Sequence, residues 1–475
     1  MLINIMIIVG LGALFIGIGW YLSGTVETAD EYILGTGRLG VAFGSASLLA
    51  FWITGNTTLA APESAYTMGI LGAVGYGLVG GMGVILFAML ARRIHEVIPH
   101  GRTVGDFYRA RYDDKNYYLF LVLLMVYVFG LLMTQGIGGG VILEEIFEIP
   151  YTLAVVLTFS IVILYTMAGG FRSVAGVAFF QILLILIAVA VIVPYVFFKV
   201  GPSNIYEGVL ANHPDKLDLL APAGLLFLTA GTVMGIGEVF MDNTFWQRGY
   251  AIRRDRVTPA FIISGIGWIF VPTAVGTLAF IALAEGLEPA HINQVAPMVA
   301  RQVAGPLAGY MFLVVVWSAL LSTAAGSLNA LTSLVLNDLI PRYKPKATQV
   351  ELKRYGMWMT VIFGAIALLL TLPRFLTMLE MLIFLAVING AFIFPIVFGL
   401  FWKRMNTNAA FTAAVVATIV GYYVYYTVGS LQGLVASGWI SFLVSIAYSW
   451  LQPADFDWEI LRHVNIDTTT PGGAK

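Results

Sequence analysis

About thirteen apolar runs, each roughly 20 residues long and separated by short polar segments, make up most of this chain. An α-helix needs about 20 residues to cross the hydrocarbon core of a bilayer, whereas a membrane β-strand needs about ten residues of alternating polarity. The runs therefore predict transmembrane helices. They lie near 3–23, 40–68, 70–91, 117–146, 150–168, 174–198, 221–249, 258–284, 305–338, 354–373, 376–401, 407–428 and 433–451.

Composition agrees with this prediction and narrows the possible functions. Of the 475 residues, 59% are hydrophobic and 11% are charged, against roughly 25% charged in a soluble domain. There is no cysteine, and the five histidines show no metal-ligand spacing. We therefore expect an all-α polytopic membrane protein that is not an enzyme. Its expected partners are a lipid bilayer and a small polar solute, without nucleic acid and with no obligate protein partner evident.

Basic residues predict the orientation of the chain in the membrane. If the N-terminus is outside, internal segments, including the one that carries Arg248, hold 21 of the 25 Lys and Arg residues. Only Lys199, Lys216, Arg301 and Arg374 then lie outside. Cytoplasmic loops of membrane proteins carry such an excess of Lys and Arg. We predict a multi-pass protein of the plasma membrane with its N-terminus outside and its C-terminus in the cytoplasm.

Two of the predicted spans contain polar interruptions. The stretch AFWITGNTTLAAPESAY (50–66) sets five consecutive residues, 54–58, that seek hydrogen bonds or weaken a helix. The stretch AGTVMGIGEVFMDNTFW (230–246) combines three glycines with Glu238, Asp242 and Asn243. Irregular backbone survives at membrane depth only where protein or a water-filled cavity meets it. Isolated threonines can also bond back to their own helix, but five such residues in a row favour a helix break.

The two interruptions occupy corresponding positions in the chain. They lie about 180 residues apart, each in the first span of a block of five, and an odd number of spans inverts the second block. Paired broken helices in inverted halves indicate a midplane substrate site of a secondary transporter. We predict an extra N-terminal helix and loop (1–39), two five-helix repeats (40–200 and 201–406), two C-terminal helices (407–451) and a cytoplasmic tail (452–475).

Several side chains in these spans are candidates for binding. A carboxylate near mid-membrane costs on the order of 3 kcal/mol, so Glu238 is either a structural acid with a partner or a contact for substrate or a proton. Glu63 and Glu380 lie nearer to span ends, where such acids either extend toward the membrane surface or face the vestibule. In WSALLSTAAGSLNALTS (317–333), Ser322 and Thr323 follow Ala319 by three and four residues on one helix face. Such hydroxyls either complete a cation site or merely pack.

One further pattern runs from the fifth span to its internal end. It consists of an apolar stretch after Tyr151, then Tyr165, Thr166, Gly169, Gly170, Phe171, Ser173 and Gln181. Other elements are RTVGDFYRARY (102–112), QRGYAIRR (247–254) and FPIVFGLFWKRMN (394–406). Together they resemble the sodium/solute symporter family, although Glu148 stands where Gly or Ser is usual.

The resemblance implies a LeuT-like core of five plus five inverted-repeat helices, with a broken first helix in each repeat. It also implies a Na⁺ site. Its ligands would be the backbone carbonyls of Ala50, Ile53 and Ala319 and the hydroxyls of Ser322 and Thr323. Many members have an aspartate where this chain has Ala178, so an auxiliary acid for sodium exit is missing.

Some features resemble the active urea and polyamine transporter branch of the family, namely Trp52, Ala178, VFMDNTFW (239–246) and LQPADFDWEI (451–460). The chemistry of the residues agrees in part, because core spans rich in acids, Asn and Thr suit a small neutral polar or amine-bearing solute. We predict that the solute contacts Trp52, Thr57, Gly235, Glu238 and Asn389.

The predicted function is symport of Na⁺ with a small polar solute, for which urea is the named candidate, by alternating access. Three alternatives remain open. Protons could drive transport through Glu238 or Asp242, the solute could be proline or a monocarboxylate, and the chain could be a passive channel or a membrane sensor.

Overall fold

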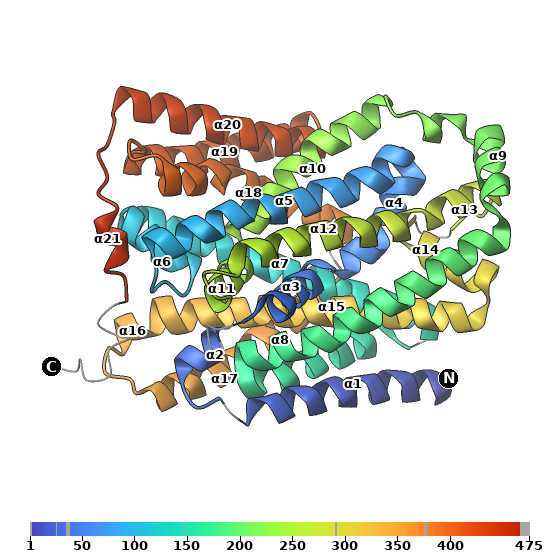
Figure 1. Cartoon of the computed structure of the whole chain (residues 1–475), viewed down its shortest axis with the longest axis horizontal. Coiled ribbons are helices and arrows are strands. Elements are labelled where there is room, and N and C mark those ends of the chain that lie inside the picture. The colour runs from blue at the N-terminus through green and yellow to red at the C-terminus, as the bar shows by residue number, and fades with distance from the viewer. Residues whose placement is uncertain are drawn as a thin grey trace.

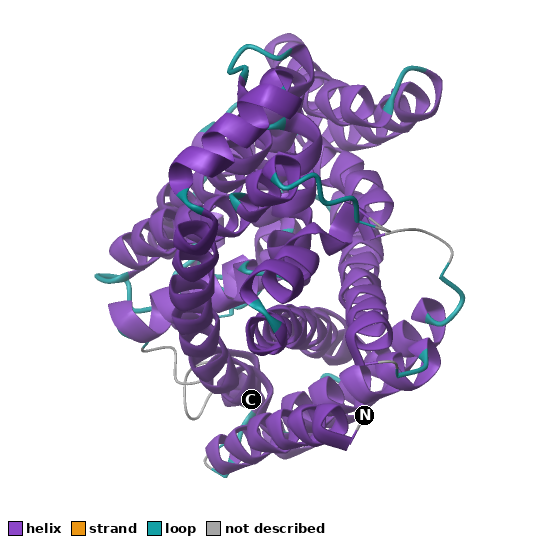
Figure 2. Cartoon of the chain, turned by 90° about the vertical axis from the view of Figure 1, so that its right-hand side faces the viewer, coloured by secondary structure: helices purple, strands orange, loops and turns teal. Residues whose placement is uncertain are grey.

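The structure is a computed structural model that describes residues 2–24, 26–34, 39–147, 149–289, 292–374 and 378–465. Within these ranges the secondary structure is helical, apart from one isolated bridge between Leu39 and Ile252. Figure 2, which looks along the bundle, shows only helices and loops. The prediction of an all-α protein is confirmed. Glu148 and residues 466–475 of the predicted tail lie outside the described residues.

The helices follow one another along the chain as labelled in Figure 1. The first part contains α1 (Leu2–Ser23), α2 (Ala29–Leu34), α3 (Val41–Trp52), α4 (Gly55–Met68), α5 (Ile70–Val97), α6 (Val104–Arg111), α7 (Asp114–Phe147), α8 (Tyr151–Val200), α9 (Pro202–Asn212) and the short η1 (Pro214–Leu217). The second part contains α10 (Pro222–Met241), α11 (Asn243–Ala251), α12 (Val257–Gly276), α13 (Leu278–Ala284), η2 (Ile292–Gln294), α14 (Val295–Val299), η3 (Ala300–Ala304), α15 (Pro306–Leu334), η4 (Val335–Leu339), α16 (Ile340–Tyr343), α17 (Gln349–Thr371) and α18 (Met378–Phe401). The chain ends with α19 (Thr407–Thr427), α20 (Ser430–Leu451) and α21 (Glu459–Arg462).

Eleven helices of the described chain are long and apolar enough to cross a membrane. One of them, α8, has 50 residues and would extend roughly 75 Å if it were straight, far more than a bilayer needs. Non-helical backbone at Gly169 and Gly170 divides it into two spans. Gly170 has φ 53°, and a Cβ there would fall 2.4 Å from the Tyr32 carbonyl oxygen, so this turn requires glycine. With the α3–α4 pair, the spans number thirteen, as predicted.

The first predicted helix break is confirmed between α3 and α4. Thr54 begins α4 as a capping box, in which the Thr57 amide donates to Thr54 Oγ1 (3.0 Å) and the Thr54 amide donates to Thr57 Oγ1 (3.1 Å). Such reciprocal bonds satisfy amides that have no partner at the start of a helix. The polar run in this span is therefore the cap that restarts the helix at mid-membrane.

The second predicted break is confirmed at Asp242, between α10 and α11. Asp242 Oδ1 accepts a hydrogen bond from the Thr244 amide (2.7 Å) and so caps α11. The sequence counted the three preceding glycines as part of the interruption, but α10 continues through them to Met241. Gly235 instead lets α10 approach α5, because a Cβ there would fall 2.6 Å from the Val79 carbonyl oxygen.

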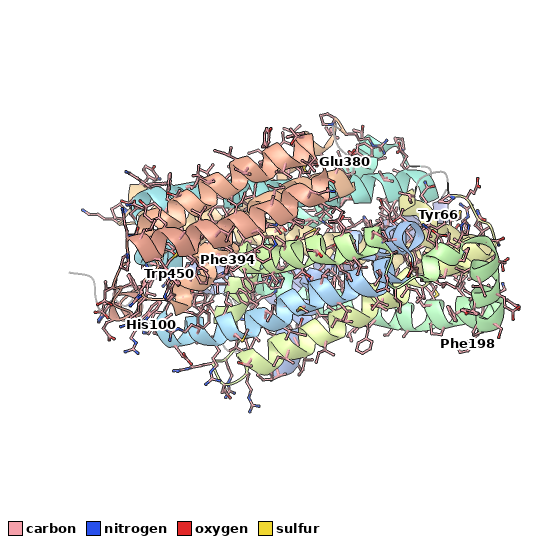
Figure 3. The ribbon with its side chains drawn as sticks, turned by 90° about the horizontal axis from the view of Figure 1, so that it is seen from above. Tyr66, His100, Phe198, Glu380, Phe394 and Trp450 are labelled. Carbon is pink, nitrogen blue, oxygen red and sulfur yellow. The ribbon has the colours of Figure 1, made fainter. Side chains whose placement is uncertain are left out.

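The bundle has two distinct ends. Figure 1 places α6, α16 and α21 at one end and α9 with α13 at the other. Figure 3, seen from above, likewise places His100 near one end and Phe198 near the opposite end. The α6 end carries Arg109 and Arg111, which agrees with the predicted internal side. The side of the membrane that each end faces, and the boundaries of the two repeats, remain predictions.

Candidate functional site

A cavity of about 340 Å³ lies beside the first helix break. It is lined along α4 from the break to Met68, and by residues of α5, α10, α12, α18 and α20. The far end of α4 lies against η1, since a Cβ on Gly69 would fall 2.0 Å from the Lys216 carbonyl oxygen. The cavity therefore runs from mid-membrane toward the α9 end of the bundle, which the basic residues predict to be outside.

Four of the five predicted solute contacts line this cavity, namely Trp52, Thr57, Gly235 and Glu238. They come from the two broken helices, which are separated by about 180 residues of sequence and meet here. Asn389, the fifth, is buried in α18 and is not among the lining residues. It packs behind α10, where a Cβ on Gly237 would fall 2.8 Å from the Asn389 carbonyl oxygen.

The cavity also contains polar groups that the sequence analysis did not assign to the solute. Asn56 is buried, lines the cavity and has no hydrogen-bond partner for Oδ1 among the described residues. Glu63, for which a position facing the vestibule was one of two alternatives, is half-buried in the cavity wall. Depth along a helix can be predicted from sequence, but the direction in which Glu63 points depends on how α4 is rotated against its neighbours.

Glu238 is held by a residue that sequence reasoning missed. Tyr127, buried on α7, donates its hydroxyl to Glu238 Oε1 at 2.8 Å. Buried polar groups need such partners, because desolvation without a hydrogen bond is costly. A lone tyrosine in an apolar run gives no signal of this role, since tyrosine is ordinary in membrane helices.

Aromatic rings form one wall of the cavity. The ring centroids of Trp52 and Trp268 lie 5.9 Å apart, and those of Tyr76 and Trp268 also lie 5.9 Å apart. Both indole N–H groups donate to backbone, from Trp52 to the Gly80 carbonyl (3.3 Å) and from Trp268 to the Trp52 carbonyl (2.8 Å). The indoles therefore contribute aromatic surface to the cavity rather than free N–H donors.

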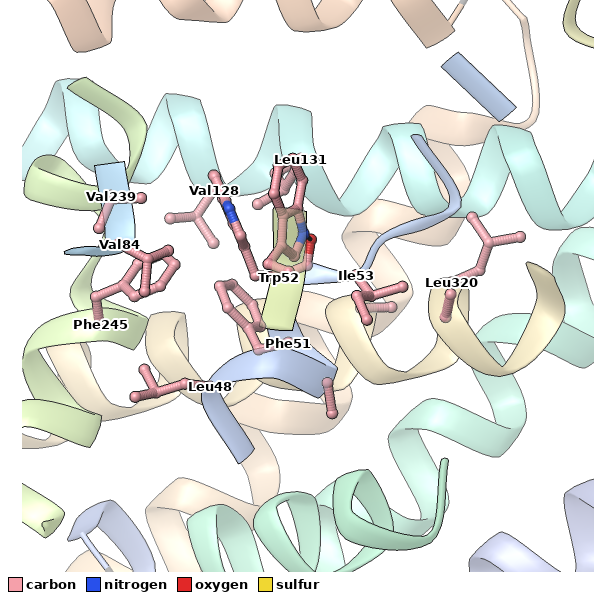
Figure 4. Close-up of a cluster of buried hydrophobic side chains, with 14 of the residues drawn as sticks. Leu48, Phe51, Trp52, Ile53, Val84, Val128, Leu131, Val239, Phe245 and Leu320 are labelled. Carbon is pink, nitrogen blue, oxygen red and sulfur yellow. Dashed lines mark hydrogen bonds between the residues drawn. The ribbon is translucent and has the colours of Figure 1, made fainter. Parts of the chain in front are cut away.

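The end of α3 lies against α15, the helix that carries three of the predicted cation ligands. In a continuous helix, the Thr54 and Thr57 amides would donate to the carbonyls of Ala50 and Ile53. Both amides donate to threonine hydroxyls instead, which leaves the two carbonyls without their helical partners. Figure 4 shows Ile53 of this break near Leu320 of α15.

The α15 side of this junction supplies hydroxyls. Thr323 Oγ1 donates to the carbonyl of Phe51 at 2.9 Å. In the sequence, Phe51 lies between Ala50 and Ile53, whose carbonyls have lost their helical partners. Ser322 Oγ is buried and has no partner among the described residues. Ala319, on the same face of α15, is fully buried. Whether these oxygen atoms bind a cation together remains a prediction.

Arg248, which the sequence analysis counted among the basic residues of an internal segment, is buried in the structure. It is 1% exposed within α11, the second half of a broken helix. Its Nε donates to the carbonyl (3.2 Å) and hydroxyl (3.1 Å) of Ser47 on α3. Its guanidinium also lies 4.9 Å from the centroid of the Phe51 ring. Hydrogen bonds and ring contacts across the two broken helices allow this charge to be buried.

The end opposite the cavity is closed by a polar network around α6. Thr103 Oγ1 donates to the buried Asp338 carboxylate of η4 at 2.8 Å. Asn337 donates to Asp106 at 3.0 Å, and the Val104 amide donates to Asn243 at the start of α11, also at 3.0 Å. These bonds join α6, α11 and the end of α15 on the side away from the cavity.

Curated proteins with similar sequences are transporters. The chain is 26% identical over 399 residues to a probable urea active transporter of Schizosaccharomyces pombe, covering 75% of this chain and 59% of that protein. It is 24% identical over 479 residues to a urea-proton symporter of Oryza sativa subsp. japonica, covering 88% and 66%. It is 28% identical over 433 residues to an osmoregulated proline transporter of Bacillus subtilis, covering 87% of each. The chain thus spans less than two thirds of the length of the first two relatives.

Solved structures support the fold. A Na⁺-coupled sialic acid symporter in a substrate-bound outward-open state superposes with a TM-score of 0.80 at 18% identity, covering 96% of this chain and 99% of that one. At this identity the likeness establishes the LeuT-like fold, as predicted. The similar proteins are symporters or other transporters, and the expectation that the chain is not an enzyme is confirmed.

The family model described as the sodium:solute symporter family matches residues 32–417. This range contains both helix breaks, the cavity-lining part of α4 and the α15 hydroxyls. The resemblance drawn from the motifs is confirmed, and the chain belongs to the sodium:solute symporter family.

Proposed function

We propose that this chain is a secondary active symporter that couples Na⁺ entry to the uptake of a small polar solute. The observation that carries the proposal is the capping box of α4. Because Thr54 and Thr57 bond to each other, the carbonyls of Ala50 and Ile53 are free to bind a cation beside α15. Na⁺ would take these oxygens with the Ala319 carbonyl and the hydroxyls of Ser322 and Thr323.

The solute would bind in the cavity next to this cation site. Trp52 lies one residue before Ile53 and lines the cavity, so a cation that fixes the end of α3 also fixes the ring that faces the solute. Thr57, Gly235 and Glu238 complete the proposed contacts. A contact with Asn389 remains a prediction, and it would need α10 to move, because Asn389 lies behind that helix.

The difference between the two ends of the molecule supports alternating access. The cavity reaches toward the α9 end, while the network around Thr103 and Asp338 closes the α6 end. Release of solute to the α6 side would require that network to separate. A single cation moving down 100 mV supplies about 2.3 kcal/mol, enough for roughly fifty-fold accumulation of a neutral solute. Coupling to one cation is therefore sufficient energetically.

Proton coupling is the second candidate, because Glu238 and Asp242 are buried acids on the broken helix and one relative is a urea-proton symporter. Uptake of labelled urea and of labelled proline into proteoliposomes, driven by an imposed Na⁺ or pH gradient, separates the two. We expect accumulation of a solute with the Na⁺ gradient alone. Accumulation that persists after Na⁺ is replaced by K⁺, and that follows the pH gradient, would contradict Na⁺ coupling. A channel would never exceed the outside concentration.

A further inference from the structure

The side chain of Arg248 connects one broken helix to the other. It belongs to α11, the second half of the second broken helix, and is buried. Its Nε donates to the carbonyl of Ser47 on α3 at 3.2 Å and to the Ser47 hydroxyl at 3.1 Å. Its Nη1 donates to the Thr244 carbonyl of its own helix at 3.3 Å. The guanidinium is therefore bonded to both α3 and α11.

The hydrogen bonds of Arg248 do not make it a simple source of stability. They go to uncharged groups, and Nη2 is buried without a partner among the described residues. Burying a charge often costs as much free energy as its partners return, and the best-attested role of a buried charge is to fix one arrangement of packed elements. Arg248 therefore fits a role in fixing α3 against α11.

Aromatic rings extend this contact to the last turn of α3. The guanidinium of Arg248 lies 4.9 Å from the centroid of the Phe51 ring and 5.6 Å from that of Phe171 on α8. Phe245, one turn earlier on α11, meets the Phe51 and Trp52 rings edge to face, with centroid distances of 5.5 Å and 5.2 Å. Figure 4 shows these three phenyl and indole rings in one buried cluster. Two side chains of α11 thus hold the end of α3.

The same turn of α3 would carry two of the cation ligands. Ala50 directly precedes Phe51, and Ile53 follows it by two residues. On its other side Phe51 fits closely against α15, since a Cβ on Gly326 would fall 2.4 Å from Phe51 Cδ2. The Phe51 carbonyl also accepts the hydrogen bond from Thr323. A shift of Phe51 would therefore move the two neighbouring carbonyls relative to the hydroxyls of α15.

We propose that Arg248 is a positioning residue that holds the end of α3 in the geometry in which its carbonyls bind Na⁺. It acts through Ser47 and Phe51, not on the ion. Because it joins α3 to α11, a shift of α3 at the first break also shifts α11 at the second. The inference rests on the proposed function, since it takes the carbonyls of Ala50 and Ile53 to be cation ligands.

The rise of the thermal unfolding midpoint with Na⁺, measured on the full-length protein in detergent, tests this role. Arg248→Lys keeps the charge but cannot reproduce the planar fork and the ring contacts. We expect the Na⁺ concentration that gives half of the maximal rise to increase at least about ten-fold. Arg111→Lys is the matched control, because Arg111 is an arginine of similar burial, 3% exposed, at the α6 end. It should lower the midpoint without changing that concentration. No increase in Arg248→Lys, or the same increase in both variants, would overturn the inference.

A smaller change decides the question if Arg248→Lys does not fold. Ser47→Ala removes one of the two acceptors of Arg248 Nε, and we expect it to raise the required Na⁺ concentration about three-fold. Ser45→Ala, on the same helix, is the control, because Ser45 Oγ donates only to the Ala42 carbonyl of α3 itself, at 3.2 Å. An equal dependence on Na⁺ in the two serine variants would contradict the assignment.

Hydrogen exchange in KCl separates this inference from the choice of coupling ion. Without Na⁺, we expect the amides of α3 and α11 to exchange at least about ten-fold faster in Arg248→Lys than in the unmodified protein, and those of α19 and α20 to be unchanged. If Na⁺ does not stabilise the unmodified protein, Na⁺ coupling is contradicted, and faster exchange in α3 still supports the joining of the two helices by Arg248. Unchanged exchange in α3 would overturn the inference even if Na⁺ stabilises the protein.

Discussion

At the scale of single residues, glycine sets how closely α5 and α10 approach. A Cβ on Gly83 would fall 2.4 Å from the Gly235 carbonyl oxygen, and backbone cannot yield as a flexible side chain can. Helices in lipid associate through such close packing, because no hydrophobic force drives them together. The cavity lies along this contact, with Gly80 and Gly235 both in its wall.

We predict that Gly83→Ala separates α5 from α10 and destabilises the protein by about 1–3 kcal/mol, the usual cost of overpacking. The midpoint of thermal unfolding in detergent measures this change. Gly10→Ala in α1 is the matched control, because a Cβ there meets no atom within 4 Å. If the two variants unfold at the same temperature, the close packing of α5 against α10 at Gly83 does not contribute measurably to stability.

Residues also differ in how far their roles can be predicted from sequence. That Trp52, Thr57 and Glu238 lie beside a helix break and line the cavity could be anticipated, because polar groups and helix breakers are costly inside an apolar run. Tyr127 and Trp268 were not, since aromatic residues are common in membrane helices and their roles depend on contacts between distant helices. Asn389 was predicted to face the solute, but sequence does not fix the rotation of α18 about its axis.

At the scale of elements, the segment after α20 ties the α6 end together. Arg111, at the end of α6, donates through Nε to the Gly399 carbonyl of α18 (2.9 Å) and through Nη2 to the Met405 carbonyl between α18 and α19 (2.9 Å). Its guanidinium lies 4.1 Å from the centroid of the Phe456 ring in the tail. Burial lowers the pKa of Arg111 from its usual value. The bonds to carbonyls and the ring contact offset the cost of burying this charge.

We predict that Arg111→Lys destabilises the protein by about 2 kcal/mol, because an ammonium cannot reproduce the planar fork that reaches two carbonyls and stacks on a ring. Thermal unfolding in detergent again gives the measurement. Arg92→Lys is the control, since the Arg92 side chain is 74% exposed and forms an ion pair with Glu96 on the surface. An unaltered unfolding midpoint in Arg111→Lys would show that the contacts of Arg111 with the two carbonyls and the Phe456 ring do not stabilise the protein.

The helices themselves were largely predictable. Apolar length determined the spans, and the runs of Thr and Asn near 54–58 and 242–244 located both breaks within a few residues. The burial of Arg248 was not predictable, because its partners, Ser47 and Phe51, come from the other broken helix. A count of charges along the chain cannot distinguish such a residue from one in a loop.

At the scale of the whole molecule, the predicted orientation can be tested because the chain has no cysteine. We expect Asp215→Cys, beside α9, to react with a membrane-impermeant maleimide added to intact cells, and Lys346→Cys, after α16, to react only after the cells are opened. Both positions are exposed, so accessibility depends on the membrane alone. The reverse pattern would contradict an N-terminus that lies outside.

The central claim is that Na⁺ binds between the first helix break and α15. The most direct test is the thermal unfolding midpoint of the purified protein as Na⁺ replaces K⁺ at constant ionic strength, because a ligand that binds only the folded state raises it. The account predicts that the midpoint rises with Na⁺. In the Ser322→Ala, Thr323→Ala double variant the same rise should need at least about ten-fold more Na⁺, whereas Ser327→Ala, on the same helix, should respond like the unmodified protein. An identical dependence on Na⁺ in the double variant and the unmodified protein would contradict the account.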